Sequence, residues 1–342
     1  MTATHRTPLS VLDLSVVNDG QSSADALATT AALAQAADRF GYTRFWVAEH
    51  HNMPSVACTA PTVLIAHLAA ITERIRVGSG GVMLPNHAPL VVAEQFALLE
   101  SLHPGRIDVG IGRAPGTDQR TAAALRRSPD LLGADTFPRD FLDLMGLLGD
   151  RRTQHGLWEA FTATPAATTS PAIYLLGSSD YSARFAAQLG LGFGFAHHFD
   201  MGGTLHAADL YRTLFQPSEV LAEPHLIVTA NVLVADTQAD ADWHSAPGRL
   251  TALGRRTGRF IRLPSPVDAA QHPDLAEANR LPTSRVVGTP DIVVPELRNL
   301  VERTGADELM VTSVAYDLDA RVRSLELLAE HWPGAAQPVT AA

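Results

Sequence analysis

Short apolar runs of β-type residues alternate with amphipathic helical stretches along most of the chain. The first strand is predicted at residues 9–15, and the helix after it runs from Ser23 to Phe40, where Gly41 ends it. The same pattern predicts strands at 43–50, 74–84, 106–112, 172–177, 192–198, 225–235 and 308–314, with helices near 60–72, 89–102, 180–189, 203–215 and 318–332. Strands that alternate with helices in this way form βαβ units, in which the strands are parallel.

Eight predicted strands at this spacing favour a closed α/β barrel over the alternative, a doubly wound sheet with a second domain. We therefore predict one (β/α)8 TIM barrel over residues 1–342. Residues 115–170 and 237–287 interrupt the rhythm. Because loops this long in a compact domain usually act as lids or binding elements, we interpret both stretches as insertions at barrel loops.

Charge and composition exclude several classes of function. The net charge is −10, so the clustered basic residues that nucleic-acid binding requires are not expected. All 26 basic residues are arginine, which excludes Schiff-base, pyridoxal phosphate and P-loop chemistry because each needs a lysine. No apolar run approaches the roughly 18 residues of a membrane span, and the N-terminus lacks a signal-peptide core. We expect a cytoplasmic protein with a small-molecule substrate.

The ends of the predicted strands carry the residues with chemical potential, since barrel active sites lie at the carboxyl ends of the strands. Glu49, His50 and His51 end the second strand. Neighbouring side chains on a strand point to opposite sides, so at most one of the two histidines enters the barrel mouth, and a paired metal site is not predicted. Glu49 is equally compatible with a buried, hydrogen-bonded carboxylate.

Three glycine-rich strand ends suit a flat, anionic ligand. Ser79, Gly80 and Gly81 leave space for a planar group to approach the backbone. Arg113 offers a bidentate positive charge directly after the fourth predicted strand, 106–112. Ser179 is a predicted helix N-cap with Ser182 three residues later, and free N–H groups at a helix start favour a phosphate.

Another strand end holds His197 and His198, which are adjacent, so that either one can face the cavity. The pattern of residues does not choose between them, because adjacent strand side chains alternate in direction.

Several long segments resemble the bacterial luciferase-like flavin monooxygenases, and together they cover nearly the whole chain: AEHHN, RVGSGGVMLPNHAPLVVAEQFALLESLHPGRIDVGIGRAPG, GSSDYSARFAAQLGLGFGFAHHF and VVGTP. The resemblance implies a (β/α)8 barrel that binds reduced FMN at its mouth. It implies that the FMN phosphate is held by Arg113, Ser179 and Ser182, and that the ring lies against Ser79, Gly80 and Gly81, where the family often has a non-proline cis peptide. It further implies that His50 is the catalytic histidine and that Glu49 supports it.

One position departs from the pattern: Gly112 stands where bacterial luciferase has a reactive cysteine. The resemblance otherwise implies an enzyme that uses FMNH2, supplied transiently by a separate flavin reductase, and O2 to oxidise a small organic substrate. It also implies a homodimer formed through early barrel helices. The bias to arginine, alanine and glycine indicates a GC-rich bacterial genome, which together with the resemblance suggests an actinomycete enzyme acting on an aromatic polyketide, as in the mensacarcin pathway of antibiotic biosynthesis.

Three other functions stay open at this point. A deazaflavin (F420)-dependent reductase or dehydrogenase has a related fold and transfers hydride without O2. A non-catalytic flavin-binding subunit is the second alternative, although the strand-end residues from Glu49 to Ser179 favour an enzyme. A metal-dependent barrel hydrolase is the third, and its usual His-x-His pair on one strand is replaced here by adjacent histidines.

Overall fold

A computed structural model describes residues 7–126, 136–150, 152, 156–199, 202–259 and 261–333. Within these residues, eight parallel strands form a closed ring, because the last strand pairs with both the first strand and β8. The ring consists of β1 (Leu9–Asp13), β2 (Arg44–Val47), β3 (Arg76–Ser79), β5 (Ile107–Gly112), β6 (Ala172–Gly177), β7 (Gly192–Phe195), β8 (Leu226–Val234) and β10 (Glu308–Thr312). The predicted (β/α)8 barrel is confirmed, and closure excludes the doubly wound sheet.

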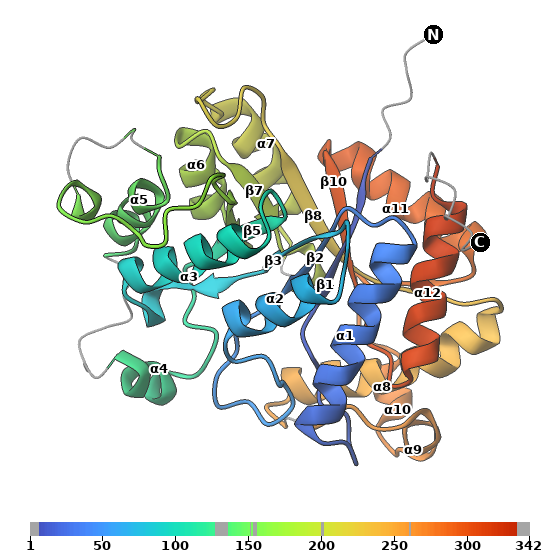
Figure 1. Cartoon of the computed structure of the whole chain (residues 1–342). Helices are drawn as coiled ribbons and strands as arrows, with labels where there is room; N and C mark the ends of the chain where they lie inside the picture. Colours follow the sequence, from blue (N-terminus) through green and yellow to red (C-terminus); the bar gives the residue numbers. More distant parts are fainter. Residues whose placement is uncertain are drawn as a thin grey trace, which may run out of the picture.

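Helices surround this ring on the outside (Figure 1). They are α1 (Ser23–Arg39), α2 (Pro61–Ala70), α3 (Pro89–Leu102), α5 (Phe137–Leu147), α6 (Asp180–Gln188), α7 (Thr204–Leu214), α11 (Pro290–Thr304) and α12 (Leu318–His331). The first helix illustrates why the boundaries fall where they do. Ser22 caps α1 in a capping box with Asp25, and Gly41 leaves the helix at a φ of 79° that favours glycine.

Two short strands extend the ring. β4 (Val82–Met83) continues from β3 and pairs with β5, while β9 (Val286–Gly288) pairs with the end of β8. The predicted strand 74–84 is therefore interrupted at Gly80 and Gly81. The predicted strand 192–198 also ends early, at Phe195, and the short 3₁₀ helix η3 (His197–Phe199) follows it.

The two expected insertions have different arrangements. The segment 115–170, part of which lies outside the described residues, contains α4 (Gln119–Arg126), α5 and the 3₁₀ helix η2 (Leu157–Glu159), and α5 packs against α3. The segment 237–287 contains α8 (Gln238–Arg256), α9 (Pro266–Gln271) and α10 (Leu275–Ala278), which pack on one another. Figure 1 places these three helices together at the lower end of the molecule, near the end of β8.

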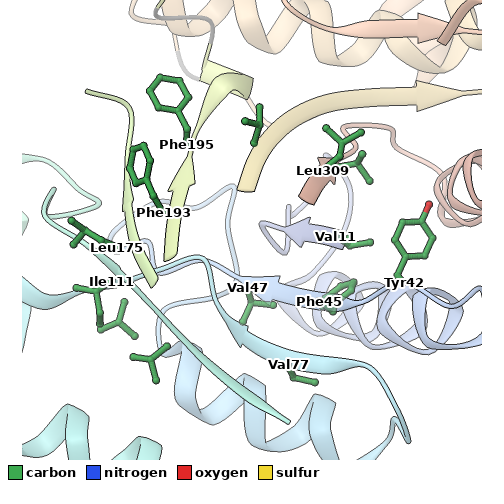
Figure 2. Close-up of a cluster of buried hydrophobic side chains, with 14 of the residues drawn as sticks. Val11, Tyr42, Phe45, Val47, Val77, Ile111, Leu175, Phe193, Phe195 and Leu309 are labelled. Atoms are coloured by element: carbon green, nitrogen blue, oxygen red, sulfur yellow. The ribbon is translucent and has the colours of Figure 1, made fainter. Parts of the chain in front are cut away.

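The strands alternate between an outer and an inner set of side chains. Phe45 and Val47 point outward into the main core between sheet and helices, together with Val77 and Ile111 (Figure 2). Trp46 lies between the first two in sequence and belongs to a separate cluster inside the barrel. This period of two is the expected geometry of a strand whose two faces are both covered.

A buried ion network fills the barrel interior at the amino ends of the strands. The guanidinium of Arg44 contacts Glu308 at 2.6 Å and Asp108 at 2.9 Å, and the indole of Trp46 donates to Asp108 at 3.0 Å. Arg76 also contacts Asp108 at 2.6 Å. Buried charges are stable only when they are paired in this way. Because the network lies at the amino ends of the strands, it fills the end of the barrel opposite the predicted active site.

No helix in the described part of the chain combines the length and the apolar character needed to cross a membrane.

Candidate active site

A cavity of about 260 Å³ lies at the carboxyl ends of the strands. Its walls are mostly apolar and include Leu12, Trp46, Leu176 and Met310. The volume lies just below the roughly 300–1,000 Å³ typical of ligand pockets. Six of the eight residues singled out from the sequence line this cavity: His50, Gly80, Gly81, Arg113, Ser179 and Ser182. Sequence positions that are up to 132 residues apart therefore meet at one site.

Glu49 does not line the cavity but is the centre of a hydrogen-bond network beneath it. Its fully buried carboxylate lies 2.8 Å from His51 Nε2 and 2.9 Å from His87 Nε2. The Asn86 side chain and the Met83 backbone N–H each donate to it at 2.9 Å. Burial alone raises the pKa of Glu49, but the hydrogen bond and charge of His87, followed by the other donors, lower it overall.

The expected support of His50 by Glu49 does not take the form of a hydrogen bond in this structure. Glu49 binds the next histidine, His51, because its carboxylate points away from the cavity toward the loop after β4. The sequence analysis did not identify His87, which lies on that loop, as a site residue. The signal that could have found it is its position in LPNH, directly after the end of β4.

Glu49, His51 and His87 each offer one ligand atom, and these atoms lie within 4.8 Å of one another. The sequence argument considered only the adjacent His50 and His51 and so did not foresee this group. Both oxygens of Glu49 already accept hydrogen bonds from Asn86 and Met83. We interpret the group as a hydrogen-bonded network that anchors the loop after β4 to the end of β2.

His50 points into the cavity, as one of the two adjacent histidines was expected to. Its backbone N–H donates to the Cys58 carbonyl at 3.1 Å, which holds the residue in place. Its Nδ1 atom is buried and has no hydrogen-bond partner among the described residues. Burial lowers the pKa of His50, so its imidazole is neutral at pH 7 and can exchange a proton with a bound molecule.

Gly80 and Gly81 are joined by a cis peptide and form one wall of the cavity. A Cβ atom at Gly80 would lie 2.8 Å from Leu12, and one at Gly81 would lie 2.7 Å from the Gly110 carbonyl oxygen. Only glycine fits at these two positions. Ser79 behaves differently, because its buried hydroxyl donates to Gly110 at 2.9 Å and faces β5 instead of the cavity.

Gly112, at the position of the reactive cysteine in bacterial luciferase, also lines the cavity. A Cβ atom there would lie 2.7 Å from the sulfur of Met83. The thioether of Met83 therefore occupies space that a larger side chain at Gly112 would need.

Arg113, Ser179 and Ser182 form the polar end of the cavity. The Arg113 guanidinium lies over the Tyr181 ring, 4.2 Å from its centroid, and pairs with no carboxylate of the described residues. Ser179 is the N-cap of α6, yet its side chain makes no capping hydrogen bond. A cation, a hydroxyl that makes no capping hydrogen bond and the start of a helix thus line the same cavity, and together they offer the chemistry that binds a phosphate.

His198 faces the cavity, while His197 turns away and its Nδ1 lies 2.8 Å from the Thr204 hydroxyl. The sequence pattern predicts a strand for both histidines, and this prediction is wrong, because β7 ends at Phe195 and both residues lie in η3. Burial lowers the pKa of His198 to about 4, so this imidazole is neutral at pH 7. Its Nδ1 has no hydrogen-bond partner among the residues that the structure describes.

Comparison with known proteins agrees with this geometry. The model of the luciferase-like monooxygenase family matches residues 7–308. The chain belongs to the luciferase-like monooxygenase family. A luciferase-like monooxygenase of Escherichia coli (strain K12) is 41% identical over 93% of this chain and 95% of its own length. The N-acetyl-S-alkylcysteine monooxygenase of Bacillus subtilis (strain 168) is 36% identical over 85% of this chain and 88% of its own length.

Solved structures of other proteins have the same architecture. The structure of apo-MsnO8 has a TM-score of 0.86 and 38% identity, and the match covers 96% of this chain and 98% of that one. More distant structures share only the fold: the oxygenating constituent of 3,6-diketocamphane monooxygenase of Pseudomonas putida in complex with FMN (20% identity, TM-score 0.69, 95% and 97% of the two chains), and an F420-dependent secondary alcohol dehydrogenase (16%, TM-score 0.66, 97% and 99%).

Proposed function

We propose that this luciferase-like monooxygenase uses reduced FMN and O2 to place one oxygen atom in a small organic substrate. Reduced FMN, when bound, supplies the two electrons with which the second oxygen atom becomes water. The observation that carries the proposal is the arrangement of the cavity: a phosphate site at Arg113 and Ser179 joins an apolar chamber with a glycine wall and a neutral histidine.

The residues present fit FMN. Arg113, Ser179 and Ser182 would hold the phosphate, because the guanidinium has no carboxylate partner among the described residues and the Ser179 hydroxyl is not used for capping. Gly80 and Gly81 would face the flavin ring, since any side chain on either would collide with its neighbours and reduce the space for a flat group. Apolar walls exclude water, which favours a reaction that must avoid hydrolysis and proton leakage.

His50 would hold or move a proton beside the reacting atoms. Its imidazole lines the cavity and is neutral at pH 7 because burial lowers its pKa. A neutral imidazole can accept a proton at one nitrogen and donate from the other. Glu49 would not touch the substrate or the flavin. It would hold the end of β2 and the loop after β4 in position through His51 and His87.

Two partners belong to the proposal. A separate flavin reductase would deliver FMNH2 transiently, and the chain would form a homodimer. In support of a homodimer, α2 and α3 expose a group of large apolar side chains, with exposed fractions of 71%, 48%, 50% and 60% for Val63, Val91, Leu98 and Leu102. Exposed apolar groups of this kind mark protein interfaces.

For the substrate, we propose two classes to be screened. Aromatic polyketides of antibiotic biosynthesis follow from the composition and the family resemblance. Thioethers such as N-acetyl-S-alkylcysteines follow from the name of the Bacillus subtilis relative, which is 36% identical. Both classes have apolar parts that suit the walls formed by Leu12, Leu176 and Met310.

Anaerobic titration of the purified protein with FMNH2 and, in parallel, with reduced F420 tests the function. We expect FMNH2 to bind and the admission of air to consume O2 and restore oxidised flavin. Binding of reduced F420 alone, without O2 consumption, would instead indicate a deazaflavin-dependent reductase. Binding of FMNH2 without any effect on its oxidation or on added substrates would indicate a non-catalytic flavin-binding subunit.

A further inference from the structure

A second cavity, of about 540 Å³, lies between α8, the loop after α10, β9 and α11. Four arginines line it, and the acidic residue among its lining is Glu296, whose side chain is exposed on α11. The arginines are Arg249, Arg255, Arg256 and Arg285. With four guanidinium groups and one carboxylate, the lining carries an excess of positive charge in a protein whose net charge is −10.

Two of these arginines have partners within the fold. Arg249 donates to Asn279 at 3.0 Å and to Asp242 at 3.2 Å. Arg256 donates to the backbone carbonyl of Pro282 at 3.2 Å, which satisfies one N–H without neutralising the charge. These contacts hold the side chains around the cavity, and the other N–H donors of both have no partner among the described residues.

Arg255 and Arg285 have no carboxylate partner among the residues that the structure describes. Burial lowers the pKa of Arg285 to about 10, and the charges of Arg255 and Arg249 act in the same direction. By contrast, the guanidiniums of Arg44 and Arg321 in the barrel each lie 2.6 Å from a carboxylate. The arginine cavity therefore gathers like charges whose repulsion a bound anion would relieve.

The arginine cavity adjoins the flavin cavity. His198 and Phe199, on η3, line both. The imidazole of His198 is neutral at pH 7, so it adds no positive charge at this junction. The positive charge therefore lies in the arginine cavity, on one side of η3. A molecule can then lie across η3 with an apolar end in the flavin cavity and an anionic end among the arginines.

We propose that the arginine cavity binds the carboxylate of the organic substrate and so directs the other end of that molecule to the flavin cavity. Arg255 and Arg285 form the charge-assisted hydrogen bonds, because both line the cavity and neither guanidinium has a hydrogen-bond partner among the described residues. The proposal rests on the proposed function in naming the organic substrate as the occupant. The other source of an anion is the FMN phosphate, which the experiment below separates from the substrate carboxylate.

Calorimetric titration of the flavin-free protein with 6-phenylhexanoate and with its neutral amide tests the site. We expect saturable binding of the carboxylate and much weaker binding of the amide. Arg255→Gln and Arg285→Gln should each weaken carboxylate binding about tenfold or more, since a charge-assisted hydrogen bond contributes about 1.5–3 kcal/mol. Arg285→Lys keeps the charge and should retain part of the affinity. The control Arg280→Gln removes an exposed charge nearby that does not line the cavity and should change nothing.

The second arm measures oxidised FMN binding by fluorescence quenching in the same variants. We expect Arg285→Gln to bind FMN like the wild type and Arg113→Gln to bind it poorly. Equal affinities of wild-type protein for the carboxylate and its amide, or loss of FMN binding in Arg285→Gln, would overturn the proposal. Neither arm requires turnover, so a protein that consumes O2 with FMNH2 but fails these tests keeps its proposed function and loses this site.

Discussion

The Nε2 atom of His87 lies 2.9 Å from both carboxylate oxygens of Glu49, although 38 residues separate the two in sequence. This contact, with that of His51, joins the end of β2 to the loop after β4. The carboxylate has its hydrogen-bonding capacity filled on that side, so it stays ionised and holds the strand end rigid. His50 lies between Glu49 and His51 in sequence, takes no part in this network and faces the cavity.

Replacement of His50 by alanine should lower kcat by roughly 10²–10⁴-fold, which is the usual contribution of a positioned acid–base group. Binding of FMN should stay unchanged, because the phosphate site lies at Arg113 and Ser179. The measurements are O2 consumption with FMNH2 and a substrate found by screening, and the FMN dissociation constant. His67→Ala, which removes an exposed imidazole from α2, is the control. Full turnover in His50→Ala would rule out a proton-transfer role.

Replacement of Arg113 by glutamine should weaken FMN binding about tenfold or more, since it removes charge-assisted hydrogen bonds to the phosphate. Riboflavin has no phosphate and should bind the variant and the wild type equally. Fluorescence quenching measures both affinities. Arg120→Gln, on the exposed surface of α4, should leave FMN binding unchanged. Parallel losses of FMN and riboflavin affinity would mean that Arg113 shapes the cavity and does not hold the phosphate.

The stability of the barrel should depend on pH through Glu308. Burial alone would raise its pKa, but the charge of Arg44 and the hydrogen bonds of His225, Arg44 and Ser10 lower the pKa from 4.5 to about 2. A carboxyl group with a lowered folded-state pKa stabilises the fold fully above the unfolded value of 4.5 and loses that contribution as the pH falls toward 2.

Glu308→Gln should therefore cost about 3–5 kcal/mol at pH 7, because it leaves the Arg44 charge without one of its buried partners. The difference in free energy of unfolding between wild type and variant should shrink between pH 4.5 and pH 2. Urea denaturation across this range measures it. Glu302→Gln, on the exposed face of α11, provides the matched control. A difference that is independent of pH would show that packing, and not charge, accounts for the loss.

The exposed apolar residues of α2 and α3 predict a homodimer. Leu98→Asp and Leu102→Asp should shift the protein toward monomer in sedimentation velocity, because burying an unpaired carboxylate in an interface is unfavourable. Leu205→Asp, at an exposed leucine on α7, should leave the assembly state unchanged. A wild-type protein that sediments as a monomer at all concentrations would end the dimer proposal.

Much of the fold followed from the sequence because its signals are local. The apolar run along β2, the helical spacing along α1 and the residues Ser22 and Gly41 at its two ends are signals that depend on near neighbours alone. The same reasoning located His50, Arg113 and Ser179 at strand ends, where the topology of a parallel barrel brings them together whatever their separation in sequence.

The tertiary structure alone decided which partner each side chain meets. The pairing of Glu49 with His87 and the choice of His198 over His197 depend on segments outside the strands, where side chains do not alternate between two faces. Ser79 ends β3, and its hydroxyl meets the Gly110 carbonyl because β3 and β5 are neighbours in the sheet. Closure of the ring through β8 and β10 and the gathering of arginines from α8 and the loop after α10 are also long-range. The sequence by itself determined which residues lie in each strand and helix. Only packing between distant segments decided which side chains touch one another and which charges are brought together.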